Sequence, residues 1–128
     1  MRVAIGRLGG IQIDCIDPMV VARFWAAVLG TELQEPLGDP PQYVNLGRWN
    51  EAPDAVMVAF QRVPERKVVK NRVHLDVEVQ DVESATAHIE TLGGSRLATP
   101  DFREYGYSWR VMADPEGNEF CLIFEAAE

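Results

Sequence analysis

Ile13-Asp14-Cys15-Ile16-Asp17-Pro18 decides the fold, because an alternating strand pattern leads there directly into a helix start. The segment continues through Phe24-Trp25 to Leu29-Gly30. Val77-Glu78-Val79-Gln80-Asp81 opens a similar segment that ends at Leu92-Gly93. The final aspartates of the two openings are 64 residues apart and the Leu-Gly pairs 63 apart, in a chain of 128 residues. An internal repeat of this size predicts two similar modules.

The first module is predicted over about residues 8–63. Residues 10–17 alternate between apolar and polar side chains, which is typical of a half-buried strand. Asp17 and Pro18 then form a helix start, and Gly30 a helix end. Between them one apolar stripe at helical spacing is made by Val20, Val21, Phe24, Trp25, Val28 and Leu29. Three further strands are expected at 31–35, 43–47 and 55–63, separated by turn-forming residues.

The second module is predicted over about residues 73–126, after a polar linker at 64–72. Residues 73–81 alternate again, and Asp81 caps a helix that ends at Gly93-Gly94. Strands follow at 95–98, 107–113 and 119–125. Each half is therefore βαβββ. We predict one α+β domain in which two βαβββ modules pair around a concave cleft, with helices covering the outer apolar face.

Composition and charge exclude several classes of function. The net charge of −8 argues against nucleic acid and anionic membrane surfaces as partners. No apolar run is long enough to span a membrane, and the first residues do not form a signal peptide. Two cysteines provide neither a disulfide framework nor a zinc-type spacing. We expect a cytoplasmic protein.

Polar residues on the first strand of each module are expected to line the cleft. The alternation places Gln12 and Asp14 on this face in the first module, and His74, Asp76 and Glu78 in the second. Polar groups in a concave interior are what a binding site requires. Aromatic side chains near irregular chain offer stacking surfaces for a planar ligand, and four are candidates: Trp49, Tyr105, Tyr107 and Trp109.

The sequence resembles the vicinal oxygen chelate superfamily, which includes glyoxalase I, extradiol dioxygenases and bleomycin-resistance proteins. Three stretches carry the resemblance: residues 17–30, Asn71-Arg-Val-His-Leu-Asp76, and Asp114-Pro-Glu-Gly-Asn-Glu-Phe-Cys-Leu122. Residues 60–72 are most similar to the small glyoxalase-like domain proteins. The resemblance implies the paired-module fold, a small-molecule ligand and a homodimer, since members of the superfamily commonly dimerise.

Enzymes of this superfamily hold a divalent metal through ligands on the first and last strand of each module. The resemblance places the first-strand ligands at His74 and at Gly10, which has no side chain. The last-strand ligand of the second module falls on Cys121, and residues 55–63 contain no carboxylate. A set with His74 as its one family-type ligand would bind an ion that prefers oxygen and imidazole poorly. We therefore expect no cofactor and no stoichiometric transition metal.

The chemistry of the cleft has open alternatives at this point. His74 serves as a ligand or general base, or as a hydrogen-bonded structural histidine. Asp76 is a candidate acid or base, and Glu119 a replacement metal ligand, against ordinary solvated carboxylates. Cys121, which is also placed among the ligand-binding residues, packs as a small hydrophobe between Phe120 and Leu122 or acts as a nucleophile, and packing is favoured. The functions considered are a small-molecule-binding protein, a metal-dependent lyase or dioxygenase, and a non-enzymatic sequestering protein of the drug-resistance type.

Overall fold

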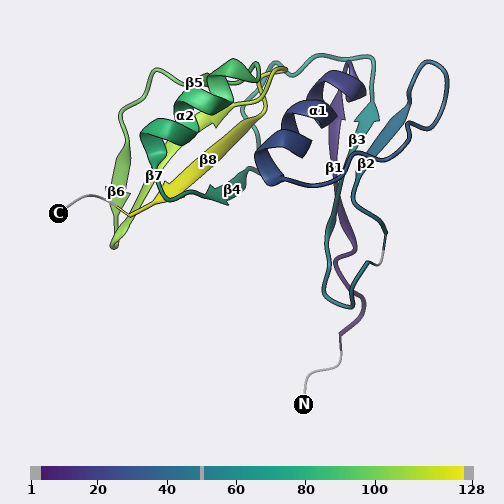
Figure 1. Ribbon diagram of the computed structural model, residues 1–128, viewed down its shortest axis with the longest axis horizontal. Coiled ribbons are helices and arrows are strands. Elements are labelled where there is room, and N and C mark those ends of the chain that lie inside the picture. The colour runs from purple at the N-terminus through teal and green to yellow at the C-terminus, as the bar shows by residue number, and fades with distance from the viewer. Residues whose placement is uncertain (1–3, 50, 126–128) are drawn as a thin grey trace. The chain divides into compact units, whose positions relative to one another are not determined.

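A computed structural model describes residues 4–49 and 51–125 of the chain, shown in Figure 1. It divides into two compact units, Met1–Glu65 and Arg66–Glu128, and the division falls inside the predicted linker. Among the described residues, each unit contains one α-helix and one mixed β-sheet, with one parallel strand pair and the other pairs antiparallel. The α+β class is confirmed. No helix among the described residues is both long and apolar enough to cross a membrane.

The first unit contains β1 (Gly10–Cys15), α1 (Pro18–Leu29), β2 (Tyr43–Leu46) and β3 (Met57–Arg62). The strand order is β1-β3-β2, with β1 parallel and β2 antiparallel to β3. The strand predicted at 31–35 is wrong as a strand: only Leu33 forms a bridge there, with Leu46. The segment runs beside β2 for a few residues before Pro36, whose ring leaves no N–H for a ladder hydrogen bond.

Both predicted ends of α1 are present. The Asp17 carboxylate accepts hydrogen bonds from the amides of Met19 and Val20 at 3.2 and 3.4 Å. Gly30 ends the helix at φ 65°, a left-handed conformation that glycine adopts without steric cost. The apolar stripe is narrower than predicted, because Val20 and Leu29 are exposed at its edges. Its buried centre consists of Val21, Ala22, Phe24 and Trp25.

The second unit contains β4 (Leu75–Glu78), α2 (Val82–Thr91), β5 (Ser95–Arg96), β6 (Phe102–Glu104), β7 (Tyr107–Ala113) and β8 (Glu119–Phe124). The order is β4-β8-β7-β5, with β6 paired to β7. β6 was not predicted; it is three residues long and joins β7 through the two-residue turn Tyr105-Gly106. The strand predicted over 73–81 is shorter, so His74 lies just before β4.

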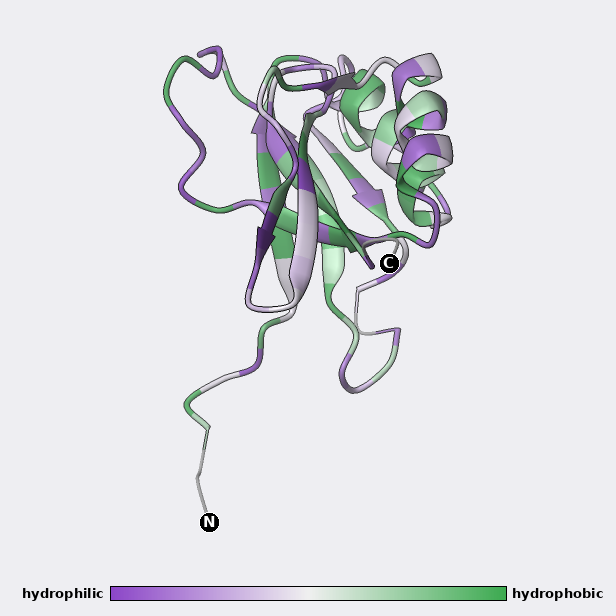
Figure 2. Cartoon of the chain, turned by 90° about the vertical axis from the view of Figure 1, so that its left-hand side faces the viewer, coloured by the Kyte–Doolittle hydropathy of each residue, from purple (hydrophilic) through white to green (hydrophobic). Residues whose placement is uncertain are grey.

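The second sheet has one face covered by α2 and one open face. Phe120 and Leu122 of β8 are buried on the covered side, as is Met112 of β7. The residues between them, such as Cys121, point to the opposite side because successive strand side chains alternate. Figure 2 colours the chain by hydropathy and shows both hydrophobic and hydrophilic stretches along the strands. The open face therefore carries the second half of the predicted site.

A buried arginine attaches α2 to β7. The Arg110 side chain is 4% exposed, and its guanidinium donates to both carboxylate oxygens of Asp101 at 2.8 Å. It also donates to Glu83 at 2.6 Å and to the Thr86 hydroxyl at 2.9 Å, both on α2. These bonds supply the partners that a buried charge requires. They link β7 to α2 and to Asp101 on the covered face of the sheet, opposite the open face.

Candidate functional site

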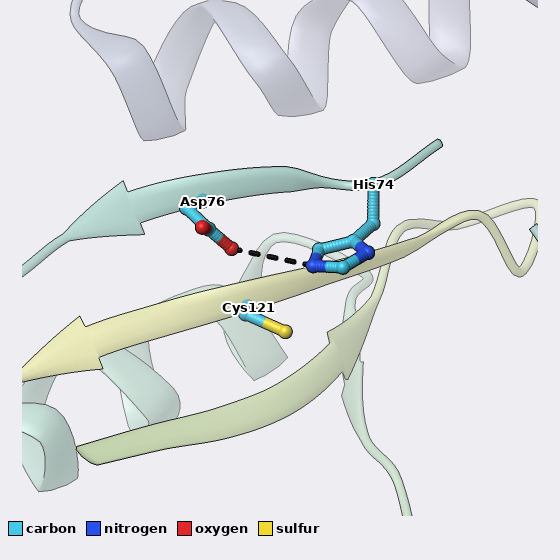
Figure 3. A group of neighbouring side chains, drawn as sticks. All are labelled: His74, Asp76 and Cys121. Carbon is cyan, nitrogen blue, oxygen red and sulfur yellow. Dashed lines mark ion pairs between the residues drawn. The ribbon is translucent and has the colours of Figure 1, made fainter. Parts of the chain in front are cut away.

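His74, Asp76 and Cys121 form a cluster on the open face of the second sheet (Figure 3). Asp76 and Cys121 are direct neighbours in the parallel pairing of β4 and β8. His74 lies two residues before Asp76 and so projects to the same side. Its Nε2 is 3.5 Å from Asp76 Oδ1, and one possible ligand atom from each residue lies within 4.8 Å of the others. The His74 and Asp76 side chains are about half exposed, whereas Cys121 is buried.

The Cys121 thiol is held in its protonated form. Burial raises its pKa first, since a thiolate loses hydration there. The negative charges of Asp76 and Glu119 raise the pKa further, and the Lys70 ammonium offsets this in part. A cysteine nucleophile requires the thiolate, and reactive cysteines have lowered pKa values. The predicted packing role of Cys121 is therefore favoured over a nucleophilic one.

The cluster forms one side of a hollow of about 660 Å³ on this face. Seven residues that the sequence analysis placed in the site line it: His74, Asp76, Glu78, Tyr105, Tyr107, Trp109 and Cys121. The remaining lining residues are Glu104 and Ile123. Glu104 was missed because it belongs to β6. Ile123 follows from alternation, since it lies two residues after Cys121 on the same strand.

Aromatic side chains make up the other side of the hollow. Trp109 is half-buried on β7 and stacks on Phe102 of β6, with ring centroids 5.4 Å apart and an interplanar angle of 15°. This neighbour fixes the indole in one orientation beside the hollow. Tyr107 and Tyr105 are 66% and 92% exposed, so their rings have little protein packed against them. Such rings are available to stack on a ligand.

Glu119 does not line the hollow, although it is on the same strand as Cys121. Its carboxylate forms an ion pair with Lys70 at 2.7 Å, and its backbone amide donates to Asn71 Oδ1 at 3.0 Å. Both partners come from the segment before β4. The pairing gives Glu119 a role in attaching this segment to β8, beside its predicted role as a replacement ligand.

The three site residues predicted in the first unit are placed within that unit. Gln12 and Asp14 are exposed on β1, as the alternation predicts. Trp49 is 58% exposed and lies against Gly9 and Gly10. A Cβ atom added to Gly10 would lie 3.2 Å from the indole ring and 3.2 Å from the Met57 carbonyl oxygen. A side chain at position 10 would therefore require the Trp49 ring or the Met57 carbonyl to shift by a few tenths of an ångström.

The superfamily's metal can be tested against these residues. The first unit offers no ligand at position 10, and β3 contains no carboxylate. The second unit offers an imidazole, a carboxylate and a thiol, a set that would suit zinc-like ions better than ions that prefer oxygen ligands once the thiol has lost its proton. The four-ligand set shared between modules does not fit this chain. The absence of a stoichiometric metal stays a prediction.

Comparison with known proteins gives the family context. The sequence model of the family described as "Glyoxalase-like domain" matches residues 10–123. No match is found among curated protein sequences. The fold is similar to a solved glyoxalase/bleomycin resistance protein/dioxygenase from Nocardioides, with a TM-score of 0.68, 16% identity, and coverage of 97% of this chain and 86% of that one.

Two further structures are similar over nearly their whole length. The oxidase ChaP-H2 aligns with a TM-score of 0.65 and 18% identity, covering 96% of each chain. A glyoxalase/bleomycin resistance protein/dioxygenase family enzyme from Burkholderia phytofirmans PsJN aligns with a TM-score of 0.62 and 14% identity, covering 94% of this chain and all of that one. Identities this low show a shared fold and carry no substrate with them.

Proposed function

This chain belongs to the glyoxalase-like domain family of the vicinal oxygen chelate superfamily, and from that premise we propose that it binds a small organic molecule in the hollow of its second sheet. The observation that carries the proposal is the composition of the hollow, with aromatic rings on one side and convergent polar groups on the other. Its volume of about 660 Å³ is within the usual range of small-molecule sites. The Tyr105, Tyr107 and Trp109 rings provide contact area, and His74 and Asp76 fix orientation.

Binding does not require a metal in this proposal. The paired His74 and Asp76 can orient a hydrogen-bonding group of the ligand, and the protonated Cys121 thiol adds apolar surface beneath it. A protein that binds in this way without turnover would be a sequestering protein. If the ligand is converted, the His74 imidazole is the group placed to accept or donate a proton.

A thermal-shift screen with small aromatic compounds, followed by titration of the hits, tests the proposal. Tyr105→Ser should weaken binding of a hit by about three- to tenfold, the loss of roughly one aromatic contact. Val73→Ser is the matched control, since Val73 is an exposed apolar residue of the same unit outside the hollow. Equal binding by the wild type and Tyr105→Ser, or equal losses in both variants, would place the ligand elsewhere.

A metal-dependent lyase or dioxygenase is the second candidate, and the His74–Asp76–Cys121 cluster is the observation that favours it. Three protein ligands with an open position are typical of catalytic zinc sites. Against it, metal binding would have to displace the proton of a thiol whose pKa is raised. The first unit supplies no family-type ligand. The His74–Asp76–Cys121 cluster alone would therefore have to bind the metal tightly enough to displace this proton.

Elemental analysis after dialysis separates the two candidates. We expect well below one transition-metal ion per chain. His74→Gln and His88→Gln form a matched pair, because His88 is exposed on α2, which covers the other face of the sheet. A content near one ion per chain that is lost in His74→Gln and retained in His88→Gln would replace the first candidate with the second.

A further inference from the structure

The lining of the hollow is negatively charged. Asp76, Glu78 and Glu104 contribute three carboxylates, and none of the residues that line it is lysine or arginine. His74 is the one lining residue able to gain a positive charge, and Asp76 is already 3.5 Å from its Nε2. The three carboxylate residues are exposed to solvent, and no ion pair of theirs with a lysine or arginine is found in residues 4–49 and 51–125.

The field near the floor of the hollow has the same sign. The Lys70 ammonium group, which lies before β4, is paired with the Glu119 carboxylate at 2.7 Å. Asp76 is the direct neighbour of Cys121 in the pairing of β4 and β8, and Glu119 lies two residues from Cys121 on the same side of β8. A group placed beside Cys121 therefore lies close to these carboxylates.

The acidic surface continues into an adjoining hollow of about 720 Å³ at the end of the same strands. Glu78, Tyr107 and Ile123 line both hollows, and Glu125 adds a further carboxylate to the second. Aromatic rings lie next to these carboxylates: Tyr107 is shared by both hollows, and Tyr105 and Trp109 line the first. The negative face of an aromatic ring attracts cations, and tryptophan does so most strongly.

We propose that the hollow selects a small organic cation, with an ammonium or amidinium group attached to a flat ring system. This deepens the proposed function and rests on it. The flat part stacks on Tyr107 and Trp109, while the charged part lies near Asp76, Glu78 and Glu104. An anionic ligand of the same shape would meet like charges, which cost free energy on binding. The ring orientation fixed by Phe102 reduces the ordering needed when the ligand binds.

Three benzyl compounds test the proposal: benzyltrimethylammonium, its uncharged carbon isostere neopentylbenzene, and the smaller anion phenylacetate. Binding is followed by two-dimensional amide and indole NMR, which also locates the affected residues. Benzyltrimethylammonium should bind at least about tenfold more tightly than neopentylbenzene, from cation–π contacts plus charge attraction. Raising the salt concentration from 0.05 to 0.5 M should weaken the binding of benzyltrimethylammonium, because salt screens partly exposed charges. The binding of neopentylbenzene should not weaken.

Glu104→Gln and Glu90→Gln are the matched variants, because each removes one carboxylate and Glu90 is exposed on α2. Glu104→Gln should weaken benzyltrimethylammonium about threefold and leave neopentylbenzene unchanged, whereas Glu90→Gln should change neither. Equal or tighter binding of phenylacetate or neopentylbenzene in the hollow would overturn the cation selectivity and leave the proposed function standing. Shifts from no probe at the hollow's residues would overturn both.

Discussion

Replacing Tyr105 with asparagine should change stability and ligand binding in opposite directions. Tyr105 has φ 53° and is the one non-glycine residue with positive φ in the ranges 4–49 and 51–125. With Gly106 at φ 83° it forms the two-residue turn between β6 and β7, where both central residues have positive φ. Asparagine followed by glycine is the preferred sequence for such a turn.

The expected gain in stability can be worked from these observations. A left-handed conformation costs a residue such as tyrosine about 1–2 kcal/mol, and asparagine tolerates it better. Tyr105 is 92% exposed, so the side chain buries about 20 Å², or about 0.5 kcal/mol at roughly 25 cal/mol per Å². The free energy of unfolding of Tyr105→Asn should therefore rise by about 0.5–1 kcal/mol, while ligand binding falls by about three- to tenfold.

Tyr107→Asn is the control, because the same substitution two residues later falls inside β7. Asparagine is disfavoured in strands, so this variant should lose about 0.5–1 kcal/mol and also weaken binding. Urea unfolding measures both free energies, with an unchanged m-value required for the comparison. The reasoning about backbone strain fails if Tyr105→Asn is destabilised, or if the two variants shift in the same direction.

Three other perturbations have calculable directions. Arg110→Met should lower the free energy of unfolding at pH 7 by about 2–4 kcal/mol, measured by urea titration, because it leaves the partly buried Asp101 carboxylate and the buried Thr86 hydroxyl without the guanidinium that donates to them. Hydrogen bonding to Arg110 lowers the pKa of Asp101, so this contribution is complete above about pH 4 and is lost as the pH falls through the folded-state value. The variant should therefore lose less stability than the wild type on acidification. Cys121 should react slowly with iodoacetamide at pH 8, and Asp76→Asn should speed the reaction by about two- to fivefold by removing a charge that raises the thiol pKa. Sedimentation at micromolar concentration should give a homodimer mass, since a dimer covers sheet edges that a lone chain exposes.

Each of these has an outcome that would count against it. Arg103 is exposed on β6, so Arg103→Met should change stability by less than about 0.5 kcal/mol, and a larger loss would point to a general charge effect. Lys70→Met should slow the alkylation of Cys121, because the Lys70 charge lowers the thiol pKa. Faster alkylation in Lys70→Met would mean that access to the thiol, and not charge, controls its reactivity. A sedimentation mass near 14.3 kDa would contradict the dimer.

The parts of the fold that were predictable are those set by local chemistry. Asp17 and Pro18 start α1 at the predicted position, because the Asp17 carboxylate and the Pro18 ring both act on the first turn of the helix. Period-two alternation predicted Asp76 on the cleft face, and the superfamily resemblance predicted Cys121 at a last-strand ligand position; both residues line the hollow. Their adjacency was not predictable, since the register of β4 against β8 depends on the tertiary fold.

The features that were not predicted also have physical causes. β6 is only three residues long. The turn that follows it has the sequence Tyr105-Gly106, whereas Asn-Gly would have predicted a hairpin. Glu104 was therefore lost from the predicted site along with its strand. The position of Trp49 over Gly10 was also unforeseen, because it brings together residues from separate loops and strands of the unit.

The same carboxylates bear on both candidate functions, with opposite effects. Asp76 can serve a metal as a ligand, yet its charge also raises the pKa of Cys121 and so keeps the thiol in a form that metals do not bind. An organic cation has no such conflict, because it needs the negative charge and does not need the thiolate. Glu78 and Glu104, which lie outside the His74–Asp76–Cys121 cluster, add to the attraction for a cation without adding a metal ligand to that cluster. The balance of charge in the hollow therefore favours a cationic organic ligand over a bound metal ion.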